Sequence, residues 1–126
     1  MEWTITAGRP VYLQLIEQLE MAIVTGEYRA GQRLPGVREL AAEAAVNPNT
    51  MQRALQELET RGLLATQRTA GRTVTADEAA LRALRTQKAA AFTREYWQQM
   101  QRLGCAYSEV AALLQAEAEK AKLEKT

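Results

Sequence analysis

The side chains with the most distinctive chemistry lie on one face of a predicted helix between Asn47 and Gln56. Three of them, Asn49, Gln52 and Arg53, are of the types that pair bidentately with base edges in the DNA major groove. A helix face that only meets solvent more often carries Glu and Lys. We therefore expect this amide-rich face to contact nucleic acid, with these three residues at the base edges.

A helix that begins after Asn47 positions these side chains. Asn is a strong N-cap because its side-chain oxygen accepts a hydrogen bond from an unpaired backbone N–H. Pro48 suits the first helical position because its φ is fixed and it lacks an N–H. Gly62 stands where a left-handed residue ends a helix. Residues spaced three and four apart form the apolar stripe of this helix: Met51, Ala54, Leu55 and Leu58.

A shorter helix over residues 37–45 precedes the first and completes a predicted helix-turn-helix. Four alanines in it allow the two helices to cross closely: Ala41, Ala42, Ala44 and Ala45. Arg38 lies in the first turn, where a cation is unfavourable with respect to the helix dipole. One explanation for a cation at this position is that the charge of Arg38 has a function. The alternative is that Arg38 pairs with a nearby Glu.

A β-hairpin is predicted after Gly62, because residues 63–66 and 72–75 are β-prone and Ala70-Gly71 provides a tip. Arg68 and Arg72 flank this tip, and arginines there are suited to neutralise phosphates. The alternative is a plain two-stranded turn with no role in DNA binding.

The segments LPGVRELA and VNPNTMQRALQELETRGLL, with their spacing and the hairpin after them, resemble the DNA-binding domain of GntR-family bacterial transcription regulators. The NPNT start resembles the YtrA subfamily in particular, and the resemblance covers about residues 9–75. It implies a winged helix-turn-helix domain over residues 1–75. The second helix of the motif would then enter the major groove while the first spans the DNA backbone.

The resemblance also implies roles for individual residues. Arg38 matches an arginine that reaches DNA in the family, and the segment from Arg68 to Arg72 matches the tip that enters the minor groove. The candidates for phosphate contact and register are Arg38, Asn47, Thr50, Arg68, Gly71 and Arg72. Thr50 has an alternative role in supporting the first helical turn. Pro48, Gln52 and Thr69 depart from the residues common in the family, so the operator sequence does not follow from it.

The N-terminal region is predicted to support the motif. Pro10 opens a helix whose apolar positions recur every four residues up to Gly26. Tyr12, on its flank, either packs or contacts a phosphate. Residues 1–8 are expected to form a short extended arm, with Trp3 packed on the domain or on a partner subunit.

Residues 76–126 are predicted to form two helices separated at Gly104, the second from about Tyr107, as a helical hairpin for dimerisation. A hairpin of this size cannot bury its own apolar stripe. We expect a second subunit to cover it through five residues: Phe92, Tyr96, Trp97, Met100 and Leu113. The alternative is that the hairpin folds back on its own winged domain. The first helix is capped by a Thr75/Glu78 box or by Asp77.

The composition excludes several classes of site. The sequence has no His and one Cys, Cys105, so Cys/His zinc sites and His-dependent catalytic triads cannot form within one chain. No glycine-rich phosphate loop appears. We expect no cofactor, no metal and no enzymatic activity. The N-terminus lacks the pattern of a signal peptide and the sequence lacks an 18-residue apolar run, so we expect a cytoplasmic protein that does not span a membrane.

Net charge gives no support for DNA binding, since it is only +1. Local clustering does: Arg29, Arg33 and Arg38 form one acid-free run, and Arg61, Arg68 and Arg72 form another. The sequence therefore predicts a mainly α fold with a small β-hairpin. Its expected function is sequence-specific binding to double-stranded DNA as a homodimeric repressor at an inverted repeat. The alternative is a winged-helix protein–protein interaction module, and the sequence identifies no small-molecule effector.

Overall fold

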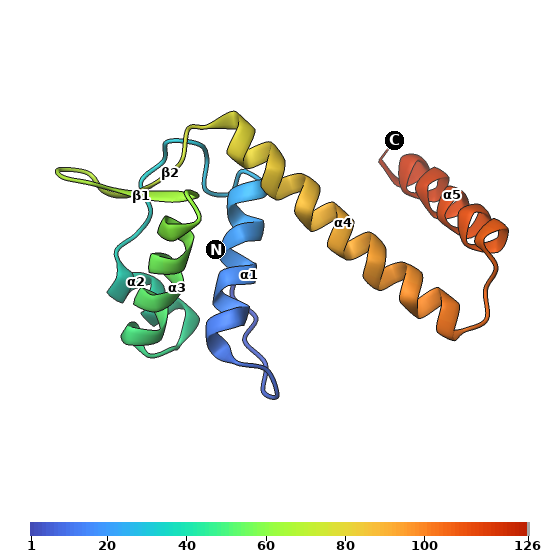
Figure 1. The fold of residues 1–126 in the computed structure, drawn as a ribbon, viewed down its shortest axis with the longest axis horizontal. Helices are drawn as coiled ribbons and strands as arrows, with labels where there is room; N and C mark the ends of the chain where they lie inside the picture. The colour runs from blue at the N-terminus through green and yellow to red at the C-terminus, as the bar shows by residue number, and fades with distance from the viewer. Residues whose placement is uncertain (126) are drawn as a thin grey trace. The chain divides into compact units, whose positions relative to one another are not determined.

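Five helices and one two-stranded sheet are found in residues 1–125, which the computed structural model describes (Figure 1). The chain divides into two compact units, one over Met1–Thr86 and one from Gln87 onward. The elements in chain order are α1 (Val11–Val24), α2 (Val37–Ala44), α3 (Pro48–Thr60), β1 (Leu64–Gln67), β2 (Gly71–Val74), α4 (Glu78–Arg102) and α5 (Tyr107–Glu124). The predicted mainly α fold with a winged helix-turn-helix and two C-terminal helices is confirmed.

The helix-turn-helix is formed by α2 and α3 as predicted. The turn between them is made by Ala45, which adopts a left-handed conformation with φ 56°. The side-chain oxygen of Asn47 accepts a hydrogen bond of 2.8 Å from the backbone N–H of Asn49, so the predicted cap is present. Only Ala41 and Ala44 are buried; Ala42 is exposed, so two of the four alanines provide the close approach and not all of them.

The core of the first unit lies where α3 packs against both α1 and α2 (Figure 1). Leu15, Leu19, Leu40, Leu55 and Leu58 are at most 1% exposed. Burying each such side chain stabilises the fold by roughly 1.5–3 kcal/mol. With its apolar stripe packed inward in this way, α3 must present its opposite face to solvent.

The wing, residues 64–74, is an antiparallel hairpin in which Leu64 pairs with Val74 and Gln67 with Gly71. Each strand is shifted by one residue from the prediction, and residues 68–70 form the connecting loop. Arg33, in a short extended segment, forms an isolated bridge with Thr73. This segment hydrogen-bonds to β2 and so anchors the base of the wing.

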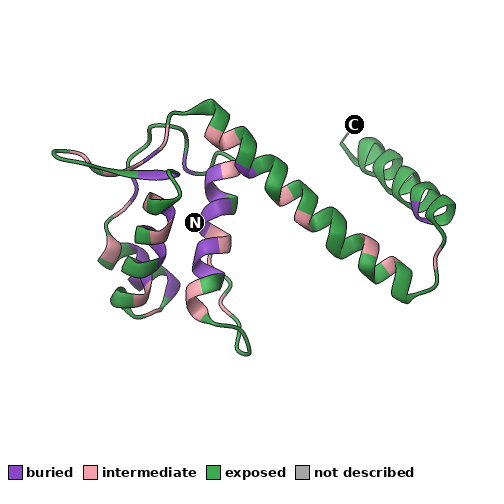
Figure 2. Ribbon diagram, in the orientation of Figure 1, coloured by how far each residue is buried: buried purple, intermediate pink, exposed green. Residues whose placement is uncertain are grey.

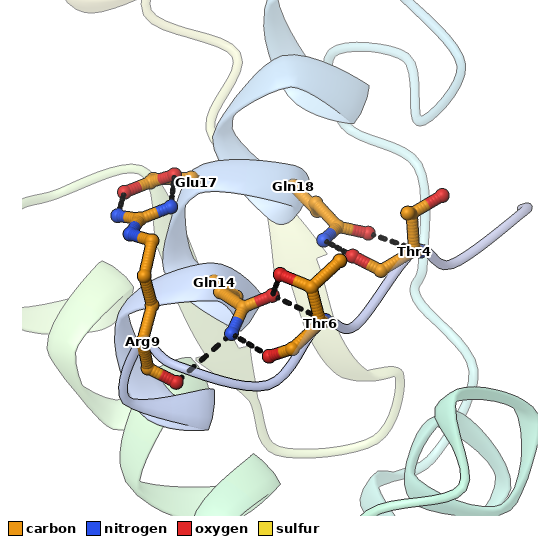
Figure 3. Close-up of polar contacts among 6 residues, drawn as sticks. All are labelled: Thr4, Thr6, Arg9, Gln14, Glu17 and Gln18. Carbon is orange, nitrogen blue, oxygen red and sulfur yellow. Dashed lines mark hydrogen bonds and ion pairs between the residues drawn. The ribbon is translucent and has the colours of Figure 1, made fainter.

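The N-terminal arm is held on α1 by two glutamines one turn apart (Figure 3). Gln14, which is 3% exposed, donates to the Thr6 carbonyl at 2.8 Å and accepts from the Thr6 N–H at 2.8 Å. Gln18 exchanges two similar hydrogen bonds with the backbone of Thr4. Side-chain amides thus replace the strand partner that an extended segment needs. Of the two expectations for Trp3, packing on its own domain is observed.

The long helix α4 begins in the first unit, where Leu84 is buried in the core and Leu81 packs against it. Asp77 caps this helix, because its carboxylate accepts from the Ala79 N–H at 3.0 Å. Beyond Gly104, which has φ 83°, α5 starts at Tyr107 as predicted. Figure 2 shows that most of α4 and α5 is exposed.

Candidate nucleic-acid interface and helical tail

The reading face of α3, defined as Asn49, Gln52, Arg53 and Gln56, is exposed along its whole length. No apolar side chain interrupts it. Thr50, beside it, is half-buried, as expected for a hydroxyl that supports the first turn. Asn47 is exposed; its oxygen accepts the capping hydrogen bond, and its side-chain NH₂ group is left to donate to a ligand. The arrangement is a polar surface with unengaged donors and acceptors.

Arg53 is held by an aromatic ring from another helix. The centre of its guanidinium lies 4.8 Å from the ring centroid of Tyr12, at the start of α1. An arginine over a tyrosine face is stabilised by the ring quadrupole, at roughly 0.5–1 kcal/mol for an exposed site. Packing is therefore the role of Tyr12 that is observed, and what it packs on is a predicted base-contacting residue.

Arg38 is exposed in the first turn of α2 and makes no ion pair with any residue that the structure describes. The predicted alternative, pairing with a nearby Glu, is therefore not observed. The N-cap of α2 is Gly36, which contributes no side-chain hydrogen bond. Glu39 also lies in this first turn, where it complements the positive end of the helix, but it makes no ion pair with Arg38.

The tip of the wing carries Arg68, which is exposed in the loop. Gly71 follows with φ 73°, and a Cβ at this position would lie 3.4 Å from the Nε atom of Arg33. Arg33 therefore runs across the backbone of Gly71. The absence of a side chain at Gly71 serves both the left-handed turn and the close approach of a second arginine.

Arg72 is not a free cation. Its Nε lies 3.0 Å from Oε1 of Glu59 in α3, and both side chains are 17% exposed. The same carboxylate oxygen accepts a hydrogen bond from the Thr66 hydroxyl of β1. That hydrogen bond, with the Arg72 guanidinium, lowers the pKa of Glu59, against the opposing effect of burial. Glu59 was not among the residues predicted from the sequence, although it lies seven positions, about two helical turns, after Gln52.

Arg61 is engaged even more fully. It lies 3.2 Å from the carboxylate of Glu20, whose side chain is 7% exposed, and 3.1 Å from that of Glu57. Its role is structural, since it neutralises a buried acid. Of the six clustered arginines, four make no ion pair within residues 1–125: Arg29, Arg33, Arg38 and Arg68.

The tail face, defined as Phe92, Tyr96, Trp97, Met100 and Leu113, contains the predicted dimerisation residues. Phe92 is 52% exposed and Leu113 49% exposed. Trp97 is half-buried and meets Tyr107 edge to face, with ring centroids 6.3 Å apart. A largely apolar groove of about 380 Å³ lies between α4 and α5, with Tyr96, Trp97 and Leu114 among its lining residues.

The described residues contain neither a membrane-crossing helix nor a cluster of metal-binding side chains. No helix there is long and apolar enough to cross a membrane. No cluster of three or more His, Cys, Asp or Glu side chains within residues 1–125 is arranged to hold a metal ion.

Residues 11–74 match the family model for bacterial regulatory proteins of the gntR family, which covers half of the sequence. The chain belongs to the GntR family. This is a family of transcription regulators and not of enzymes. The predicted resemblance is therefore confirmed.

Individual relatives extend this result. The chain is 42% identical over 65 residues to the uncharacterized regulator YhcF of Bacillus subtilis, a match covering 52% of this chain and 54% of YhcF. It is 40% identical over 65 residues to the repressor YtrA of the same organism, covering 52% of this chain and 50% of YtrA. The matched segment thus spans about half the length of these curated relatives. A GntR-family regulator from Listeria monocytogenes, known by structure, is 34% identical with a TM-score of 0.82 over 89% of this chain and 98% of its own.

Proposed function

We propose that this GntR-family protein binds a specific DNA operator as a homodimer and represses transcription in the cytoplasm. The observation that carries the proposal is the exposed reading face of α3. Arg38 and Arg68 add exposed cations that make no ion pair within residues 1–125. Amides and arginine on an exposed helix suit the donors and acceptors of base edges. A protein-binding surface would be expected to carry aromatic anchors instead, and the reading face has none.

In this proposal α3 enters the major groove, which is wide enough to admit a helix. Asn49, Gln52 and Arg53 contact base edges. The backbone contacts come from Arg38, from the free amide NH₂ of Asn47 and from Thr50. The wing contributes Arg68, Gly71 and Arg72 at the adjacent minor groove or its phosphates. Sequence is read by the first group, and register is fixed by the second.

The homodimer is proposed from the tail face. Phe92 and Leu113 are about half exposed, and apolar residues gathered on two neighbouring helices mark an interaction surface. A second copy related by a two-fold axis would present the same face in return. Two winged units would then read half-sites about 34 Å apart, or a multiple of that distance, on an inverted repeat. Residues 1–75 would form the DNA-binding domain and residues 76–126 the dimerisation hairpin.

Repression is supported by the name of one relative, the B. subtilis repressor YtrA. A bound dimer would act simply by occupying promoter DNA. Any small-molecule effector would have to act at the tail, where a largely apolar groove lies between α4 and α5.

A binding experiment tests the proposal. Duplexes are selected from a random-sequence DNA pool with the full chain, and affinities for a selected and a scrambled duplex are measured by fluorescence anisotropy at several salt concentrations. Gln52→Ala should lose discrimination between the two duplexes by about 1–3 kcal/mol. Arg68→Ala should weaken binding to both duplexes. The slope of log affinity against log salt concentration should fall by about one, as expected for the loss of one phosphate contact. No preference of the unmodified chain for any selected duplex would contradict the proposal and favour the protein-interaction module.

A further inference from the structure

We propose that Glu59 is a positioning residue for DNA binding, which holds Arg72 so that its two terminal nitrogens face the DNA backbone. This inference rests on the DNA binding proposed above. It assigns a role to an acidic residue on a surface that is otherwise expected to be neutral or basic.

Glu59, Thr66 and Arg72 form a set of contacts between α3 and the wing, which we call the Glu59 bracket. A single oxygen, Oε1 of Glu59, accepts from the Thr66 hydroxyl and, at 3.0 Å, from Nε of Arg72. Thr66 and Arg72 are opposite each other in the register of the hairpin. One carboxylate of α3 therefore hydrogen-bonds to both strands of the wing at paired positions and fixes the wing relative to the helix.

The bracket uses only part of the guanidinium. Arginine has five N–H donors, of which one is on Nε and four are on the terminal nitrogens. The hydrogen bond to Glu59 is made through Nε, and neither terminal nitrogen of Arg72 bonds to another residue in the described chain. These terminal nitrogens form the edge that binds phosphate bidentately. With its rotamer already fixed, Arg72 would lose less conformational freedom on binding DNA than a mobile arginine would.

Two explanations of the contact between Glu59 and Arg72 predict opposite changes in DNA affinity when the charge of Glu59 is removed. Since Glu59 lies about two helical turns after Gln52, its carboxylate is on the same side of α3 as the reading face. If Arg72 merely neutralises this carboxylate, removing the negative charge should strengthen DNA binding. If Glu59 positions Arg72, removing the charge should weaken binding, even though the protein becomes more basic.

The test is Glu59→Gln in the full chain, with the selected duplex described above as the probe. We expect affinity to fall about three- to tenfold and the salt slope to decrease toward that of Arg72→Ala. Glu57→Gln is the matched control: it also removes one acid from α3, but its partner is Arg61, which also pairs with the buried Glu20 and is not among the proposed DNA contacts. The control should bind as well as the unmodified chain or more tightly.

Two further measurements isolate geometry from charge. Glu59→Asp keeps the charge but is one methylene shorter, so it cannot reach both partners; affinity should fall, whereas neutralisation alone predicts no change. In an Arg72→Ala background, Glu59→Gln should not weaken binding further, because the residue that Glu59 positions is absent. Circular dichroism at the assay temperature confirms that each variant is folded.

The outcomes distinguish the two proposals. If the unmodified chain discriminates the selected duplex but Glu59→Gln binds it equally or more tightly, the positioning role is overturned and the DNA-binding proposal stands. If the unmodified chain does not discriminate, both proposals are overturned. Weakening by both Glu59→Gln and Glu57→Gln would show a general loss of structure and would also overturn the specific role of Glu59.

Discussion

The winged unit buries the apolar side chains of its helices, whereas the tail exposes many of its own. In α3 the apolar stripe is covered, with Met51 and Leu58 at 0% exposure, and the polar side meets solvent. In α4 beyond Leu84 and in α5, large apolar side chains meet solvent instead; Phe92 is 52% exposed and Leu123 is 76% exposed. The first arrangement needs no further protein to be stable, and its free surface is chemically suited to DNA. The second remains incomplete until another apolar surface covers it.

The arginines show the same contrast on a smaller scale. Arg61 is fixed by a buried acid and is part of the fold. Arg38 and Arg68 are exposed and have no ion pair in the described chain. Arg72 lies between these cases, because its Nε is held by Glu59 while its terminal nitrogens make no hydrogen bond within residues 1–125. A count of arginines therefore overstates the cationic surface, and the partners of each one decide its role.

The largest expected effect is on stability, at the core of the first unit. Leu55→Ala removes a side chain that is 1% exposed and should lower the free energy of unfolding by about 2–5 kcal/mol, since the cavity cannot collapse fully. Urea denaturation measures this. Gln56→Ala, on the exposed side of the same helix, is the matched control and should change stability by less than about 0.5 kcal/mol. Equal losses at the two positions would mean that α3 is not packed as described.

The next effect concerns assembly. Replacing both Phe92 and Leu113 by Ser should convert a dimer to a monomer at micromolar concentration, as measured by sedimentation velocity. Affinity for a two-half-site duplex should then fall about a hundredfold or more, because the two winged units are no longer linked. Leu123→Ser, near the polar end of α5, is the control and should remain dimeric. An unmodified chain that sediments as a monomer would contradict the proposed role of the tail face.

The sequence was most informative where one physical rule decides a local structure. Asn47-Pro48 predicted the start of α3, and Gly104 predicted the break between α4 and α5. The burial of the α3 stripe followed from its periodicity. The ends of the two strands were each misplaced by one residue, because short β-prone runs have no fixed ends.

The partners of the site residues were the part that the sequence did not reveal. Glu59 meets Arg72 across 13 positions, and Arg61 meets Glu20 across 41. Such pairs depend on tertiary packing, which no local pattern encodes. A helical spacing argument places Glu59 on the reading face, but only the structure shows that the wing returns to it. The buried Gln14 was missed for the same reason, since its partners belong to the N-terminal arm.

A smaller effect is expected at the contact between α1 and α3. Tyr12→Leu removes the ring beneath Arg53 and should weaken binding to the selected duplex about two- to fivefold, in line with roughly 0.5–1 kcal/mol for an exposed cation–π contact. Tyr12→Phe retains the ring and should bind normally. A loss with Tyr12→Phe would instead indicate that the hydroxyl itself contacts DNA, as in the alternative role considered for this residue.

The smallest effect is the pH dependence of the Glu59 bracket. The pKa of Glu59 is lowered from its ordinary value of 4.5, chiefly by the Thr66 hydrogen bond. A carboxyl with a lowered folded-state pKa stabilises the fold fully above its unfolded-state pKa, and this stabilisation is lost as pH falls through the folded-state pKa. The unmodified chain should therefore be more stable than Glu59→Gln at pH 7, by about 1 kcal/mol or less because solvent partly screens the pair. Urea midpoints for the two proteins should converge as the pH is lowered from about 5 to 3. A difference that persists unchanged at pH 3 would show that the carboxylate charge is not what ties the wing to α3.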